Sequence, residues 1–295
     1  MIIPSIKYWV EQAEKDCCPL WQIVLREEMT DSELSQEEIY SRLSLTYAAM
    51  KKAAESGLSA HTRSISGMTG GDAAKYYNYI KAGRSMLSDL CSKAVAYALA
   101  TSECNASMGV IVAAPTAGSA GILPGAYIAA QEIFGFSDKD VCNALLTAAG
   151  VGAVISEKAS LAGAVCGCQA ECGSAGAMTA AGICQLMGGS VQQCIDAAAL
   201  ALKNCLGLAC DPVAGLVEVP CVKRNGMYTV FAINAADMAL AGVRSFIPFD
   251  EVIDSMRRIG MDMPPCIRET GEGGLATTDT GKAAREKIFG SRGER

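Results

Sequence analysis

Residues 172–195 read CGSAGAMTAAGICQLMGGSVQQCI and contain no charged side chain. A second uncharged stretch runs from Asn105 to Gln131. Either stretch is long enough for a membrane span, but glycine and glutamine interrupt the first, and Pro115 and Pro124 interrupt the second. Both stretches therefore predict the buried core of a globular protein, the second with a glycine-rich loop over about 105–125, and we expect no membrane insertion.

The composition also favours a large helical core. The chain is 51% hydrophobic and 19% charged, below the roughly 25% charge of an ordinary globular protein. Strand patterns are limited to residues 110–112 and 217–219, which are too short to carry a sheet. We predict a mainly α fold, a helical catalytic domain whose glycine-rich loops converge on one site. Sparse charge and few aromatic residues also indicate apolar surface covered by another chain.

Helix patterns and breaks divide the chain into three segments. Residues 1–60 read as an N-terminal helical segment packed on the core, 61–281 as the core, and 282–295 as a charged mobile tail, all within one structural domain. Helix starts are predicted at Ser35, Ser137 and Ser190, and stops at Gly135 and Gly188. Beyond the N-terminal segment the predicted helices span about 73–82, 85–102, 125–134, 138–155, 174–187, 190–204, 226–242 and 250–259.

Charge and cysteine content restrict the partners and the compartment. A formal net charge of −6 argues against binding to nucleic acid. Residues 1–15 are interrupted by charges and do not read as a signal peptide, so we expect a cytoplasmic protein. The 14 cysteines are therefore expected to be thiols, metal ligands or core residues rather than disulfides.

Three cysteines, Cys168, Cys210 and Cys221, are predicted to lie on loops, next to residues that bend or free the backbone. Three thiolates can hold three irons of a four-iron cluster and leave one iron open as a Lewis acid. From spacing alone, this interpretation and the alternative of three unrelated buried thiols are equally well supported. Cys166 and Cys172 are second-choice ligands. A structural zinc site is a further alternative, which a single histidine in the chain disfavours. Cys91, Cys142, Cys184, Cys194 and Cys205 read as buried core residues.

The loop that begins at His61 has the composition of a binding site. His61 is the only histidine and opens a polar, glycine-rich segment, so it is a candidate acid or base. Residues 64–71 offer hydroxyls and glycine N–H groups in front of a predicted helix, an arrangement that suits an anion such as a small carboxylate. An ordinary glycine-rich turn is the alternative.

Several motifs together resemble the iron–sulfur-dependent L-serine dehydratases, and more narrowly the alpha subunit of the two-subunit bacterial form. The matching segments are 66–71 (SGMTGG), 105–109 (NASMG), 114–121 (APTAGSAG), 167–171 (GCQAE), 210–215 (CDPVAG), 220–221 (PC) and 268–276 (RETGEGGLA). The resemblance covers about residues 60–280.

The resemblance implies conversion of L-serine to pyruvate and ammonia, a step of serine catabolism that feeds gluconeogenesis. It implies a [4Fe–4S] cluster held by Cys168, Cys210 and Cys221, whose open iron binds the serine hydroxyl. His61 becomes the candidate base. The carboxylate and amine of serine are expected to meet two groups of residues: Ser66, Met68, Thr69, Gly70 and Gly71 in one loop, and Asn105, Thr116, Ser119 and Gly121 in the other.

The resemblance also implies a separate regulatory beta subunit and therefore a hetero-oligomer. Single-chain relatives end in a cysteine that reaches the cluster, whereas this sequence ends Gly293-Glu294-Arg295, so we expect no such tail contact. Asp279 stands where the family often has proline, which we expect to affect a turn only.

Two other functions remain open from the residues alone. A pyridoxal-phosphate lyase needs a Schiff-base lysine, but Lys75 and Lys81 are predicted on helix surfaces. A non-catalytic, metal-binding subunit is the other alternative.

Overall fold

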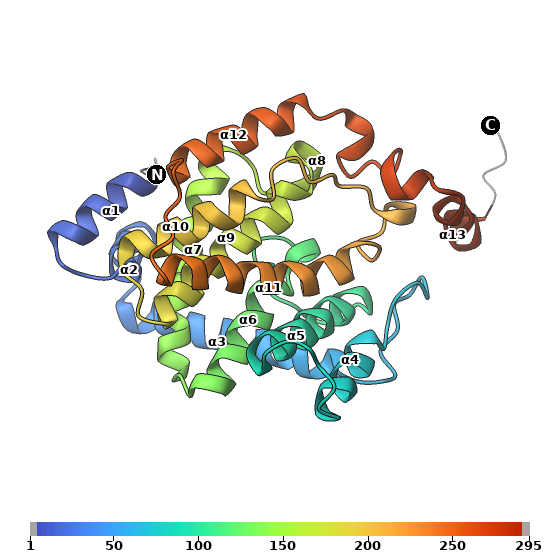
Figure 1. The fold of residues 1–295 in the computed structure, drawn as a ribbon, viewed down its shortest axis with the longest axis horizontal. Helices are drawn as coiled ribbons and strands as arrows, with labels where there is room; N and C mark the ends of the chain where they lie inside the picture. Colours follow the sequence, from blue (N-terminus) through green and yellow to red (C-terminus); the bar gives the residue numbers. More distant parts are fainter. Residues whose placement is uncertain (1–4, 291–295) are drawn as a thin grey trace.

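The computed structural model describes residues 5–290, and within this range the chain forms thirteen α-helices and no β-strand (Figure 1). An isolated bridge pairs Cys210 with Arg268. The helices are α1 Ile6–Lys15, α2 Leu20–Ser32, α3 Gln36–Gly57, α4 Asp72–Lys81, α5 Asp89–Ala106, α6 Ile122–Phe134, α7 Asp138–Lys158, α8 Gly163–Cys166, α9 Ser174–Leu186, α10 Val191–Lys203, α11 Cys221–Leu240, α12 Phe249–Asp262 and α13 Asp279–Phe289. The mainly α prediction is confirmed. The C-terminal Gly293-Glu294-Arg295 lies outside the described residues.

Local sequence signals place several helix ends. The predicted starts at Ser35, Ser137 and Ser190 are confirmed, and each serine forms a capping box with the side chain three residues later. Such a box satisfies two of the backbone N–H groups that lack helical partners. Gly135 ends α6 in the left-handed conformation, with φ of 74°, where glycine avoids the strain that a Cβ atom causes.

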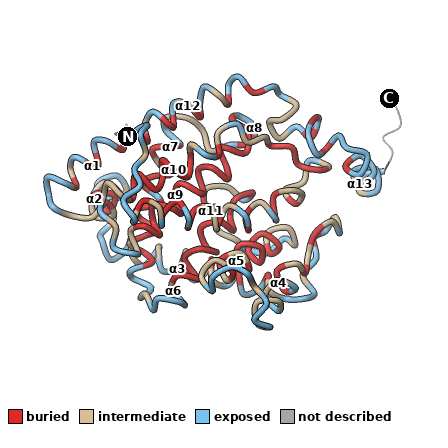
Figure 2. The backbone as a smooth tube through the Cα atoms, in the orientation of Figure 1, coloured by how far each residue is buried: buried red, intermediate tan, exposed pale blue. Residues whose placement is uncertain are grey.

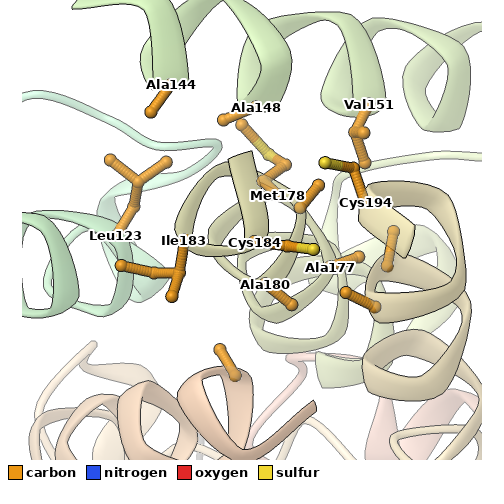
Figure 3. Close-up of a cluster of buried hydrophobic side chains, with 14 of the residues drawn as sticks. Leu123, Ala144, Ala148, Val151, Ala177, Met178, Ala180, Ile183, Cys184 and Cys194 are labelled. Atoms are coloured by element: carbon orange, nitrogen blue, oxygen red, sulfur yellow. The ribbon is translucent and has the colours of Figure 1, made fainter. Parts of the chain in front are cut away.

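Helix α9 lies at the centre of the molecule, against α6, α7, α10 and α11 (Figure 1). Its Met178 and Ile183 pack among Leu123 of α6, Val151 of α7 and Cys194 of α10 (Figure 3). The backbone of these central helices is largely buried, whereas α13 is mostly exposed and α12 has one buried and one exposed side (Figure 2). The uncharged stretch at 172–195 is thus confirmed as core over 172–184, whereas residues 185–193 are partly or fully exposed. The second stretch is buried over 118–130, whereas residues 105–113 are partly or fully exposed.

The N-terminal helices contribute to the same core. Trp9 of α1, Leu20 of α2 and Tyr47 of α3 belong to the buried cluster that includes the α9 side chains. Helix α7 is long and apolar enough to cross a membrane by length and composition, but 67% of its apolar window is buried inside the protein. Burial of this kind is typical of a core helix in a globular protein.

Small residues in α9 allow its close packing against neighbouring helices. Substitution of two of its glycines by alanine is therefore expected to change the free energy of unfolding in opposite directions. A Cβ atom on Gly182 would overlap Tyr127 Oη and lie 3.0 Å from the Ala144 carbonyl oxygen, whereas one on Gly176 would have no atom within 4 Å. We expect Gly182→Ala to lower the free energy of unfolding by about 2–3 kcal/mol. Gly176→Ala is expected to raise it by about 0.5–1 kcal/mol, the ordinary gain in a helix. Urea unfolding of both variants tests this pair, and changes of the same sign would contradict it.

Two segments differ from the sequence-based expectation. Helix α11 begins at Cys221 rather than near residue 226, because Gly226 does not break the helix. A Cβ atom added to Gly226 would lie 3.3 Å from the Leu99 side chain of α5. Glycine at this position therefore allows α11 to approach α5. Residues 282–289, predicted as part of a charged mobile tail, belong to α13, which Thr278 caps through its side chain.

Candidate metal centre

A π-helical turn at Gln169–Gly173 joins directly to α9 and carries the first cysteines of the site. Cys168 precedes this turn and Cys172 lies within it, and their sulfur atoms are 3.5 Å apart. Residues four apart on a helix share one face, and isolated π turns are frequent at functional sites. Both thiols are buried.

Cys210 reaches the same place from a distant part of the chain. Its backbone N–H donates to Ile267 O (2.8 Å), and its carbonyl accepts from Glu269 N (2.8 Å). These bonds fix Cys210 between the core and the C-terminal segment. The sulfur of Cys168, the sulfur of Cys210 and a carboxylate oxygen of Glu171 all lie within 4.8 Å of one another. This donor set is compatible with a metal site.

Cys221 is the first residue of α11 and is buried, but it lies outside that group of three donors. Burial raises the pKa of the Cys221 thiol to about 12, and the negative charge of Cys168 adds to the rise, so the two cysteines are electrostatic neighbours. Asn225 Nδ2 donates to the Cys221 carbonyl (2.9 Å) and to Gly118 O (2.7 Å). Asn225 thus ties the start of α11 to the 116–121 loop.

Arg224 places a positive charge, only partly exposed, beside the cysteines. It donates to Ala209 O (3.0 Å) and lies 3.5 Å from a carboxylate oxygen of Asp211, next to Cys210. Hydrogen bonding with Cys172 and Cys210 holds the pKa of Cys168 well below its usual value, and Arg224 contributes in the same direction. Cys168 is therefore the cysteine most readily present as thiolate, the form that binds metals.

Glu171 is the acidic member of the site. Its Oε1 accepts from Thr116 Oγ1 (2.9 Å) and its Oε2 from the Cys210 thiol (3.8 Å). A Cβ on Gly163 would lie 2.8 Å from Glu171 Oε2 and 3.0 Å from Cys210 Sγ. Glycine at this position keeps the space beside both donors open. Burial raises the pKa of Glu171 to about 7.

A sequence model of the family described as "Serine dehydratase alpha chain" matches residues 15–276. The chain belongs to the serine dehydratase alpha chain family. It is 47% identical over 286 residues to a probable L-serine dehydratase, alpha chain, of Bacillus subtilis, covering 97% of this chain and 95% of that protein. It is 46% identical over 270 residues to the L-serine dehydratase, alpha chain, of Peptoniphilus asaccharolyticus, covering 92% of each.

A longer relative shares only part of the length with this serine dehydratase alpha chain. The L-serine dehydratase of Mycobacterium tuberculosis is 47% identical over 184 residues, which are 61% of this chain and 40% of that protein. The resemblance drawn from the motifs is thereby confirmed at the level of the family.

The Ser66–Gly71 loop, predicted to hold an anion, already contacts two protein carboxylates. Ser66 Oγ and Thr69 Oγ1 both donate to Glu218 Oε2, at 2.8 and 3.0 Å. The backbone N–H of Met68 donates to Ser66 Oγ (3.0 Å), inside the loop. Glu218 lies three residues before Cys221, so it connects this loop to the cysteine-bearing segment.

The N-terminus of α4, which follows the loop, is capped by a buried carboxylate from α5. Glu103 accepts from the backbone N–H groups of Gly71 (2.9 Å), Asp72 (2.9 Å) and Ala73 (3.4 Å). Gly70, with φ of 133°, allows the chain to pass close to Arg63. The positive end of the α4 dipole, predicted to attract an anionic ligand, is thus already compensated by the carboxylate of Glu103.

Removing this cap should destabilise the protein. Glu103→Gln replaces one carboxylate oxygen with an NH₂ group that faces backbone donors and leaves buried N–H groups unsatisfied. We expect the free energy of unfolding to fall by about 1–3 kcal/mol. Urea unfolding measures the change, and Glu55→Gln, at an exposed position on α3, is expected to stay within about 0.5 kcal/mol of the wild type. Equal stability of the two variants would contradict the capping role.

The second predicted loop reaches the cysteine site. Thr116 and Ser119 hydroxyls lie 3.1 Å apart, and Thr116 contacts Glu171. Gly121 donates its backbone N–H to Asn225 Oδ1 (2.8 Å), and Asn105 Nδ2 donates to Ala117 O (3.3 Å). Thr116 is therefore the predicted substrate residue that the structure brings into direct contact with the metal-ligand candidates.

Of the remaining candidates, Cys172 belongs to the site, whereas His61, Cys166 and Lys75 have their described contacts elsewhere. His61 is exposed, and its backbone N–H donates to Ser59 Oγ (3.3 Å). Cys166, a second-choice ligand, packs against Gly260 of α12, whereas Cys172 joins the site. Lys75 is on the surface, as predicted, in an ion pair with Asp72 (2.8 Å).

Sequence reasoning did not assign a role to Glu171, Arg224 or Asn225. Two of these residues had a signal in the sequence. Glu171 ends the Gly167–Glu171 motif just before the uncharged stretch, and Arg224 lies about one helical turn after Cys221. Asn225 had no local signal, because its partners Gly118 and Gly121 are more than a hundred residues away.

Proposed function

We propose that this chain is the catalytic alpha subunit of an L-serine dehydratase, which converts L-serine to pyruvate and ammonia with a [4Fe–4S] cluster held by Cys168, Cys210 and Cys221. The observation that carries the proposal is the buried grouping of Cys168, Cys210 and Glu171. It occurs in a chain that matches relatives named L-serine dehydratase, alpha chain, over 92% or more of its length.

The donor residues suit such a cluster. Buried cysteine thiols are the usual ligands of iron–sulfur clusters, and Gly163 and Gly118 leave space where a Cβ atom would approach Glu171. When bound, a cluster with one iron free of cysteine supplies a Lewis acid for the substrate hydroxyl, a poor leaving group. Arg224 would balance part of the negative charge of the thiolates.

The two loops are proposed to hold the ends of the amino acid. Glu218 makes the loop with Ser66, Met68, Thr69, Gly70 and Gly71 acidic, so this loop suits the ammonium group. Asn105 and the loop containing Thr116, Ser119 and Gly121 would orient the carboxylate. His61 would then remove the α-proton as general base, and fixed orientation of that proton contributes to the rate.

We further propose a separate beta subunit as partner in a hetero-oligomer and a cytoplasmic location. The designation "alpha chain" of the relatives supports a second kind of subunit. Large exposed apolar side chains such as Met86, Val110 and Phe246 offer a surface for this second subunit. The cysteines, all of which lie within the described residues, are free thiols, which supports the cytoplasmic location. Anaerobic co-purification of this chain with a candidate beta chain tests this pairing.

The experiment that tests the function is anaerobic purification, followed by iron and sulfide analysis and a pyruvate assay with L-serine. We expect about four irons per chain and pyruvate formation that air abolishes. Zinc without iron would favour a non-catalytic metal-binding subunit. A visible band that borohydride removes would instead favour a pyridoxal-phosphate lyase. The same assay with L-threonine defines the substrate range.

A further inference from the structure

Glu171 differs from the other buried carboxylates in how its charge is compensated. Glu103 accepts three backbone N–H groups, and Asp211 faces Arg224. Asp196 has Arg244 at 3.7 Å and accepts from Ser245 N (2.9 Å). Among residues 5–290, the buried carboxylates Glu171 and Glu218 make no ion pair. Glu218 accepts from two hydroxyls, at 2.8 and 3.0 Å, whereas Glu171 has a weaker set of donors. It receives one hydroxyl from Thr116 and one thiol, which is a weak donor.

A carboxyl group this deeply buried is stable as an anion only beside a cationic partner or a metal, and otherwise it tends to take up a proton. Only 9% of Glu171 is exposed, and its oxygen lies within 4.8 Å of the sulfurs of Cys168 and Cys210. Thr116 orients the carboxylate through Oε1, which leaves Oε2 on the side of Cys210. The glycines at 118 and 163 keep other side chains away from both oxygens.

We propose that Glu171 is an exchangeable fourth ligand, whose carboxylate binds the cluster iron that no cysteine holds until the substrate takes that position. This inference rests on the proposed function, because it takes the cluster as given. A carboxylate is a suitable exchangeable ligand because it binds iron through oxygen and can be displaced by another oxygen donor. Thr116 is then a positioning residue, since it acts through Glu171.

The test uses a small thiol as a competing ligand. Ethanethiol is titrated into the anaerobically reconstituted chain, and its binding to the open iron is followed by visible absorbance. If Glu171 occupies the iron for about nine-tenths of the time, its removal should tighten apparent thiol binding about tenfold. We expect this change in Glu171→Gln, and a smaller tightening in Thr116→Val, where the carboxylate is no longer held.

Glu269→Gln is the matched control. Glu269 is also a carboxylate beside Cys210 and raises the pKa of Glu171 through its charge, but it does not belong to the group of close donors. Its removal should change thiol affinity less than about twofold. An equal effect of Glu269→Gln would mean that Glu171 acts through charge alone and would overturn the ligand assignment.

Glu171→Asp provides a second variant, because it keeps the charge and withdraws the oxygens by one methylene group. We expect it also to tighten thiol binding. Wild-type thiol affinity in both Glu171 variants, with the cluster present by iron and sulfide analysis, overturns the proposal. Absence of any cluster from the wild type and every variant would refute the proposed function instead, so the two failures are distinguishable.

Discussion

Cys168→Ala is expected to remove the iron of the proposed cluster and to lower serine turnover at least about a thousandfold, since a Lewis acid supplies several kcal/mol of transition-state stabilisation. Cys168 is central to the site, because its sulfur lies 3.5 Å from that of Cys172 and belongs to the close group with Cys210 and Glu171. It is also the cysteine whose pKa is lowered by its neighbours. Iron and sulfide analysis of the anaerobically purified variant measures the loss.

Two further cysteine variants show whether this loss is specific. Cys142 on α7 is a buried thiol of the core, and Cys142→Ala should retain iron and activity at the cost of a modest loss in stability. Cys172→Ala should also retain iron if Cys168, Cys210 and Cys221 are the three ligands. Loss of iron in Cys172→Ala together with retention in Cys221→Ala would move the third ligand from Cys221 to Cys172.

The helices were predictable because their signals are local. Capping serines at 35, 137 and 190 act on backbone groups three residues away, so a short window of sequence contains the whole interaction. The start of α11 was placed too late, because Cys221 beside Pro220 reads as part of a loop, whereas the helix begins at Cys221 and continues through Gly226. Helix α13 was not predicted, because its segment is rich in charged residues. Among the residues of α13 only Gly281 is buried, so the segment has no apolar pattern that indicates a helix.

The site was predictable only where residue type alone indicates chemistry. Cysteines beside glycine or proline, together with the motif resemblance, pointed to Cys168 and Cys210, which the structure brings together. The partners of the polar loop were beyond sequence reasoning, because Glu103 and Glu218 come from residues far along the chain. Without them, the Ser66–Gly71 loop reads as an open anion site, whereas its donors already have carboxylate acceptors.

His61→Ala is expected to lower kcat about 100- to 10,000-fold, the usual contribution of a general base, while iron content stays at the wild-type level. His61 is exposed and its described hydrogen bond is through the backbone N–H, so removal of the imidazole should leave the fold and the cysteine site intact. The same exposure lets added imidazole reach the position, and we expect it to restore part of the activity in His61→Ala but not in Cys168→Ala. Steady-state assays with L-serine, with and without imidazole, measure both effects. Near-normal turnover of His61→Ala with a full cluster would contradict the assignment of His61 as base. Since the chain contains no second histidine, the base would then be a residue of another type.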